Sequence, residues 1–222
     1  MTMPLLTFCA FYPAFILTGR QLVRQAAGFI HEQEGKRPRA LPGACRLVLL
    51  FAGVAALVAT RGLVLTLPAP EVLRDLLLTG WCLLLSTLDL ARRWLPLRHT
   101  SGFIASGLLF SLLPGAAVTL PVAVVNGLVM FTLLSVFRHW ANRHGPERFG
   151  QGDVWLLAGF SAWLTLPVSA GLTLCALGLI ALRHLAGLTG LMARAREVPF
   201  APWFSLCLAA SILAQRFPFS TG

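Results

Sequence analysis

Two aspartates stand out among the residues that could do chemistry, because each borders a long apolar segment. Asp89 ends one such segment, and Asp153 opens another within the run Gly150-Gln151-Gly152-Asp153. Carboxylates at membrane depth are costly and therefore need a reason to be there. Two carboxyl groups that meet can share a proton, one acting as general base and the other as general acid. Such a pair can activate water against a peptide carbonyl, and neither residue has a fixed role because the pKa values of a coupled pair belong to both.

The composition indicates an all-α, multi-pass membrane protein. Of the 222 residues, 57% are hydrophobic and 12% are charged, whereas soluble domains carry about a quarter charged residues. A helix needs about 20 residues to cross a bilayer, and the chain has enough apolar segments for about eight such helices. We expect them near residues 4–19, 47–67, 72–88, 100–113, 118–137, 154–166, 168–182 and 199–214.

The basic residues predict how these helices are oriented. Cytoplasmic loops are enriched in Lys and Arg, and most of the 18 basic residues, among them Arg20, Lys36 and Arg37, fall on one side if the amino terminus lies outside. This orientation places Asp89 and Asp153 at the cytoplasmic ends of their helices, at one depth. The net charge of +10 then faces anionic lipid headgroups. Nucleic-acid binding is disfavoured because the basic residues are spread over separate loops.

Each aspartate also has a simpler structural explanation. Asp89 could pair with Arg92 or Arg93, which lie three and four residues later, at helical neighbour spacing. Asp153 could simply cap a helix. The glycines at 150 and 152 favour more than a cap, because glycine permits unusual backbone conformations and lets another chain segment approach closely.

Three blocks of the sequence together resemble the type IV prepilin peptidases, membrane aspartyl proteases that share the Gly-x-Gly-Asp signature with the presenilins. The first block runs from Leu88 to Pro96 and continues to Thr100, and the second runs from Gly150 to Ala158. The third, Val198 to Phe204, resembles the Pro-Phe-Gly-Pro segment of the family. The order and spacing of the blocks match the family from Leu47 to the end of the chain.

The resemblance implies specific roles for eight residues. It implies that Asp89 and Asp153 are catalytic, and that substrate contacts Gly150, Gly152, Pro199, Phe200, Ala201 and Pro202. It implies removal of the basic leader from prepilin or pseudopilin precursors at the cytoplasmic face of the bacterial inner membrane, without a cofactor. The product would pass to a type IV pilus or type II secretion assembly. The alternative is a non-catalytic membrane component or small transporter that uses the acids as a proton or cation relay, although no convincing internal repeat supports a transporter.

The chain departs from the family pattern at three positions of these blocks. Leu97 stands where the family commonly has Asp, Trp155 where it has Lys, and Ala201 where it has Gly. None of these changes removes a carboxylate. They raise the question of whether substrate approach and efficiency are typical of the family.

We divide the chain into a first part, residues 1–46, with one helix and a short basic loop, and a peptidase domain, residues 47–222. Many prepilin peptidases hold zinc in the first loop through two Cys-x-x-Cys pairs. Here that loop has only Cys45, and no two cysteines have the spacing of a structural zinc site. We therefore expect no metal. The methyltransferase motif of the family is only echoed at Tyr12 to Leu17, so methyl transfer is weakly supported.

Other protease chemistries fit these residues poorly. Ser106-Gly107 resembles the serine segment of rhomboid proteases, but the histidines lie in loops or at helix ends, where none is expected within reach of the hydroxyl. A small pair that lets helices pack closely is the better explanation. His31-Glu32 lacks the second histidine that a zinc protease motif requires.

Two further polar segments carry structural expectations. Glu71, Arg74 and Asp75 should form a cluster at the outer interface, with Arg74 as the counter-ion. Pro199 and Pro202 should keep the intervening backbone out of a regular helix, where it could pair with an extended substrate. The simpler alternative is that Pro199 starts a helix.

Overall fold

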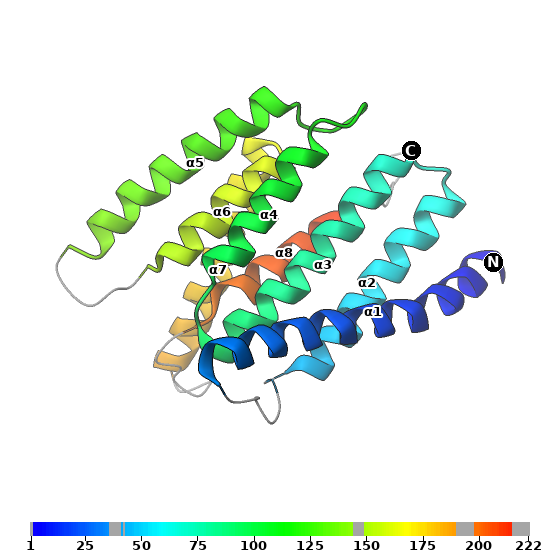
Figure 1. The fold of residues 1–222 in the computed structure, drawn as a ribbon, viewed down its shortest axis with the longest axis horizontal. Coiled ribbons are helices and arrows are strands. Elements are labelled where there is room, and N and C mark those ends of the chain that lie inside the picture. The colour runs from blue at the N-terminus through cyan, green and yellow to red at the C-terminus, as the bar shows by residue number, and fades with distance from the viewer. Residues whose placement is uncertain (1, 36–40, 42, 144–148, 190–197, 215–222) are drawn as a thin grey trace. The chain divides into compact units, whose positions relative to one another are not determined.

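The all-α prediction is confirmed by the computed structural model, which describes residues 2–35, 41, 43–143, 149–189 and 198–214. These residues form eight helices and no strand (Figure 1). The helices are α1 (Thr2–Glu34), α2 (Ala44–Val64), α3 (Ala69–Arg92), α4 (Leu97–Phe110), α5 (Leu120–Ala141), α6 (Gln151–Trp163), α7 (Leu166–Leu188) and α8 (Phe200–Ala214).

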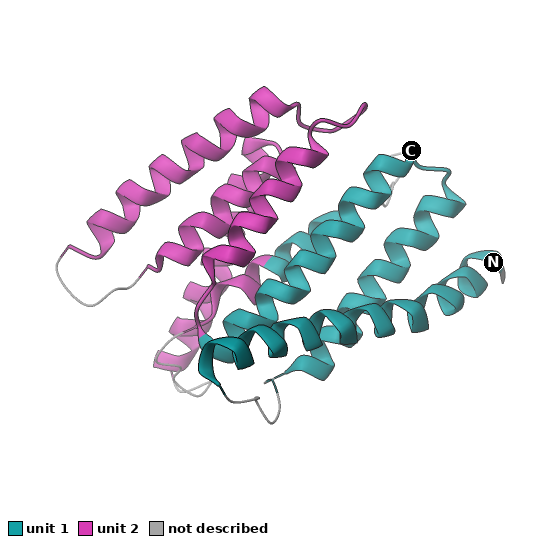
Figure 2. Cartoon of the chain, viewed as in Figure 1, with its two compact units in different colours: residues 1–92, 205–222 teal, residues 93–204 magenta. Residues whose placement is uncertain are grey.

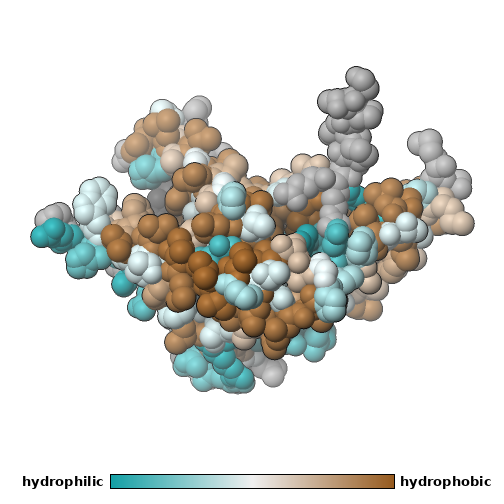
Figure 3. Space-filling model, turned by 90° about the horizontal axis from the view of Figure 1, so that it is seen from above, coloured by the Kyte–Doolittle hydropathy of each residue, from teal (hydrophilic) through white to brown (hydrophobic). Residues whose placement is uncertain are grey.

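The apolar surface of the helices confirms a multi-pass membrane protein. Within the described residues, four helices are long and apolar enough to cross a membrane, namely α1 from Met3, α2, α5 and α7. On α5, Leu128, Leu133 and Val136 are each at least 60% exposed, as suits a helix surrounded by lipid tails that are as apolar as leucine. Hydrophobic residues cover much of the face seen in Figure 3.

The chain divides into two compact units (Figure 2). Unit 1 comprises residues 1–92 and 205–222, and unit 2 comprises residues 93–204. Unit 1 therefore contains α1, α2, α3 and most of α8, whereas unit 2 contains α4 to α7 and the first turn of α8. The functional division at residue 46 stays a prediction.

The first helix is longer than the sequence analysis predicted. We placed its end near residue 19 and a basic loop after it, but α1 continues to Glu34. The expected loop at Arg20 is wrong because the apolar residues beyond it form a second packing face. Ala26, Phe29 and Ile30 are buried in a cluster with Leu84 and Leu88 of α3. The basic loop residues Lys36 and Arg37, on which the orientation partly rests, lie outside the described residues, so the orientation stays a prediction.

In unit 2, helices α4 and α6 approach closely at Gly107, as the sequence predicted. A Cβ atom at this position would lie 2.7 Å from Nε1 of Trp163. That Nε1 donates a hydrogen bond to the Phe103 carbonyl oxygen at 3.1 Å. The neighbouring Ser106 hydroxyl donates to the same carbonyl within its own helix, at 2.8 Å. Gly107 is therefore explained by packing.

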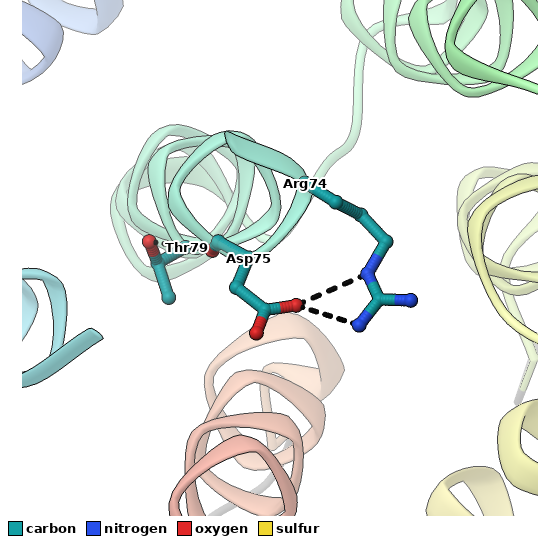
Figure 4. Close-up of polar contacts among 3 residues, drawn as sticks. All are labelled: Arg74, Asp75 and Thr79. Carbon is teal, nitrogen blue, oxygen red and sulfur yellow. Dashed lines mark hydrogen bonds and ion pairs between the residues drawn. The ribbon is translucent and has the colours of Figure 1, made fainter. Parts of the chain in front are cut away.

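A buried ion pair lies near the start of α3. Arg74 donates from Nη2 to Oδ1 of Asp75 at 2.9 Å and from Nε at 3.1 Å (Figure 4). The Asp75 side chain is only 2% exposed. Thr79, one turn later, donates from its hydroxyl to the Asp75 carbonyl oxygen at 3.0 Å. The predicted pairing of Arg74 with Asp75 is confirmed.

Candidate active site

Asp153 lies in the first turn of α6. Gly150 is the N-cap residue, with extended backbone angles of φ −74° and ψ 150°, and α6 begins at Gln151. The Oδ2 atom of Asp153 lies 3.3 Å from the position that a Cβ atom of residue 150 would occupy, so the carboxyl group folds back over the N-cap. Free backbone N–H groups and the helix dipole stabilise negative charge at this end of a helix. The Gly-x-Gly-Asp sequence thus builds a turn that presents a carboxylate.

Gly152 brings this turn against the segment that follows α3. A Cβ atom on Gly152 would lie 2.9 Å from the Leu95 Cβ atom and 3.2 Å from the Leu95 carbonyl oxygen. Real Cβ atoms essentially never approach another atom so closely as 2.9 Å. The close backbone approach that the glycines predicted is confirmed. The segment that Gly152 approaches belongs to the first block, Leu88 to Pro96, which contains Asp89.

The Gly152→Ala variant is expected to lose about 1–3 kcal/mol of unfolding free energy, because the added methyl group overpacks against a backbone that cannot rotate away. Thermal unfolding in detergent, followed by tryptophan fluorescence, measures the loss. Gly171→Ala is the matched control in unit 2, since nothing lies within 4 Å of its added Cβ atom. A Gly152→Ala variant as stable as the control would contradict the close approach.

Asn142 anchors the other side of the turn. Its Nδ2 donates to the Phe149 carbonyl oxygen at 3.0 Å, and its Oδ1 accepts from the Phe149 backbone N–H at 3.2 Å. The Phe149 ring packs edge-on against Phe137, with ring centroids 5.6 Å apart. The residue before Gly150 is therefore held through both backbone groups. Asn142 was not among the predicted site residues, because its only signal in the sequence is an amide residue at the end of a helix.

Asp89 lies near the end of α3 and is 5% exposed. The helix ends at Arg92, and Arg93 adopts a left-handed backbone with φ 52°. The Arg92 guanidinium forms an ion pair with Glu34 of α1. Arg92 therefore has an acidic partner on another helix, which weakens the explanation that Asp89 exists only to neutralise it.

The segment between α3 and α4 leads through Pro96 into a helix that contains Thr100, as the first block predicted. Pro96 is the N-cap of α4, with φ −64° and ψ 135°. Thr100 is fully buried, and its hydroxyl donates to the Pro96 carbonyl oxygen at 3.3 Å. Leu97, where the family commonly has Asp, is the first residue of α4 and is 60% exposed.

The Pro199 to Pro202 segment does not have the irregular backbone that we expected. Pro199 precedes α8, and Phe200, Ala201 and Pro202 form its first turn. Proline is tolerated there because the N–H groups of the first turn have no partner within the helix. The simpler explanation, that Pro199 starts a helix, describes this backbone. Phe200 and Ala201 are 5% and 2% exposed.

The candidate residues divide between the two units. Asp89 belongs to unit 1, whereas Asp153, both glycines and residues 199–202 belong to unit 2. The meeting of the two aspartates therefore stays a prediction. Trp155, two residues beyond Asp153, packs against Phe131 of α5 with centroids 4.6 Å apart. Among the described residues, no group of three or more His, Cys, Asp or Glu could hold a metal ion.

Comparison with known proteins identifies the family. A leader peptide-processing enzyme for type 4 prepilin-like proteins from Escherichia coli is 32% identical over 73% of this chain and 60% of its own length. Prepilin leader peptidase/N-methyltransferases from Pectobacterium carotovorum and Aeromonas hydrophila are each 32% identical, over 64% and 63% of this chain. The chain covers 51% and 48% of these two proteins, so it spans about half to three fifths of the length of the curated relatives it matches. No solved structure matches. The model of the type IV leader peptidase family matches residues 76–214, which include both aspartates, and the chain belongs to this family.

Proposed function

We propose that this chain is an intramembrane aspartic endopeptidase that removes the basic leader of prepilin or pseudopilin precursors. The observation that carries the proposal is the Asp153 turn. Its Gly152 packs against Leu95 of the first-aspartate block, and both blocks lie within the segment that matches the leader peptidase family. The relatives named above are leader-processing enzymes, which favours hydrolysis over an ion relay.

The proposed chemistry uses one ionised and one protonated carboxyl group. The ionised group takes a proton from water while the water oxygen bonds to the scissile carbonyl carbon. The protonated group donates to the carbonyl oxygen. The tetrahedral intermediate then breaks its C–N bond as a proton passes to the leaving nitrogen. This division is the usual one for paired aspartates.

The two helix ends support such an unequal pair. Asp153 lies at the N-terminal end of α6 and Asp89 near the C-terminal end of α3, so the two carboxyl groups stand at opposite ends of their helix dipoles, and the proposal assigns neither of them a fixed role. The proposed reaction uses no metal ion and no cofactor.

The orientation of the chain suits a substrate with a basic leader. We propose that both aspartates lie at the cytoplasmic face of the bacterial inner membrane. The first helix of the substrate would lie in the bilayer and its positively charged leader would stay on the cytoplasmic side. The product would supply a type IV pilus or a type II secretion assembly.

The test is cleavage of a co-expressed prepilin by the full chain in a bacterial membrane that lacks other prepilin peptidases. Cleavage is read as a mobility shift, and the amino terminus of the product is sequenced. The expected result is one new terminus directly after the basic leader. The mass of the product also reports methylation. No cleavage of several prepilins by a chain that is present and folded in the membrane would overturn the proposal.

The Asn142→Ala variant is expected to cleave about tenfold more slowly, because Phe149 loses both hydrogen bonds that hold the residue before the Gly150 N-cap. Asn126→Ala, within the helix that Asn142 caps, is the matched control and should cleave like the unmodified chain. Initial cleavage rates at equal membrane abundance distinguish the two. Equal rates for both variants would show that Asn142 does not position the turn.

A further inference from the structure

Five buried residues with polar side chains form a single stripe along α3. Asp75, Thr79, Cys82, Ser86 and Asp89 follow one another at alternating intervals of four and three residues. This spacing keeps side chains on one face of a helix. All five residues are buried, with exposed fractions between 1% and 7%. Asp89 is therefore the inner end of a polar face that runs the length of α3.

In unit 1, this stripe meets α8 through Ser205. The Ser86 and Ser205 hydroxyl oxygens lie 2.9 Å apart in a hydrogen bond. The Cys82 side chain hydrogen-bonds to the same Ser205. At the outer end of the stripe, Asp75 points toward α8 (Figure 4). We call Cys82, Ser86 and Ser205 the polar seam.

The side of α3 that faces α1 packs mainly through apolar side chains, and the Arg92–Glu34 ion pair on this side is solvent-exposed, with 41% and 40% of the two side chains accessible. Leu84 and Leu88 contact the inner part of α1 through Ala26, Phe29 and Ile30. Each leucine is two residues from Ser86, which places it about 160° around the helix axis from the seam. In an apolar solvent such packing resists rotation weakly, because lipid tails are as apolar as the side chains. The seam is directional, since rotation would break its hydrogen bonds and leave buried hydroxyls unpaired.

We propose that the polar seam fixes the rotation of α3 about its own axis, and so the direction in which the Asp89 carboxyl group leaves the helix. Ser86 and Ser205 are then positioning residues for the cleavage reaction, and this inference rests on the function proposed above. A buried polar residue at a heptad position is known to fix helix register. Ser86 is one turn from Asp89 on the same face, so the constraint acts close to the carboxyl group.

A small rotation is sufficient to affect the reaction. A helix with its side chains has a radius of about 5–6 Å, so a rotation of about 10° moves a carboxyl oxygen by about 1 Å. A misplacement of about 1 Å can reduce a catalysed rate about 100-fold. Substrate binding through other parts of the chain would be affected much less. Loss of the polar seam should therefore lower kcat and leave KM nearly unchanged.

The experiment compares Ser86→Ala, Ser205→Ala and the double variant with Thr87→Val as the matched control. Thr87 is a buried hydroxyl on the same helix, but it donates to the Leu83 carbonyl oxygen within α3 at 2.7 Å. All variants are assayed as the full chain, at equal membrane abundance, on one prepilin. Their thermal unfolding is measured in the same detergent to separate positioning from stability.

The expected result is a kcat lower by about 10- to 100-fold for each serine variant, with KM within about threefold of the unmodified chain. The double variant should lose no more than the worse single variant, because the two residues act through one contact. The control should keep its kcat while its melting temperature falls as much as that of the serine variants.

Two outcomes overturn the inference, and they are distinguishable. In the first outcome, the unmodified chain cleaves and the serine variants keep its kcat, or their kcat and that of Thr87→Val fall together with melting temperature. The seam then does not position Asp89, and the proposed function stands. If the unmodified chain cleaves no prepilin, the proposed function fails and the inference fails with it.

Discussion

The Asp89→Asn and Asp153→Asn variants are each expected to lose prepilin cleavage by at least about a thousandfold. Asparagine keeps the shape of aspartate but can neither take a proton from water nor donate one as an acid. Either change therefore removes one of the two proton transfers in the proposed reaction. The measurement is the initial rate of product formation, at equal membrane abundance and with unchanged melting temperature.

A second acid, Glu34 at the C-terminal end of α1, provides the control for Asp89. Glu34 pairs with Arg92, three residues after Asp89, but its side chain is 40% exposed. The Glu34→Gln variant removes the same charge and is expected to cleave at close to the unmodified rate. Cleavage by both aspartate variants would disprove the two-aspartate mechanism. Equal losses in Glu34→Gln and Asp89→Asn would show that charge balance near Arg92, rather than proton transfer, controls activity.

The helices of this chain were predictable where an apolar run ends at a polar or breaking residue. The predicted start of α8 differs from the observed one by a single residue because Pro199 precedes the helix. At α1 the same logic failed. Arg20 interrupts the apolar run, but Phe29 and Ile30 find partners on α3, and packing of this kind stabilises a helix more than its local sequence does.

The candidate site was predictable only where its chemistry is local. The Gly-x-Gly-Asp run predicted a turn that carries a carboxylate, and α6 begins at this turn. The Leu95 contact of Gly152 joins segments that are far apart in the sequence, so no local pattern could name it. The hydrogen bond between Ser86 and Ser205 could not be predicted for the same reason. A serine in an apolar helix is unremarkable until its partner on another helix is known.

Substitutions in the buried Arg74–Asp75 ion pair of α3 are expected to lower the unfolding free energy strongly. Arg74→Leu is expected to cost about 3–5 kcal/mol of unfolding free energy, because the Asp75 carboxyl group, 2% exposed, would lose its ion pair with Arg74. Asp75→Leu should cost less, because the Arg74 side chain is 16% exposed and long enough to reach the interface with its charge.

The double variant decides whether the pair itself stabilises the fold. Removing both charges avoids an uncompensated buried ion, so Arg74→Leu with Asp75→Leu should recover most of the loss and come within about 1 kcal/mol of the unmodified chain. Denaturant unfolding in a defined detergent measures all three variants, and Arg20→Leu on the exposed surface of α1 is the control for losing an arginine. If the double variant is as unstable as Arg74→Leu, the pair holds the N-terminal end of α3 through contacts that leucine cannot replace.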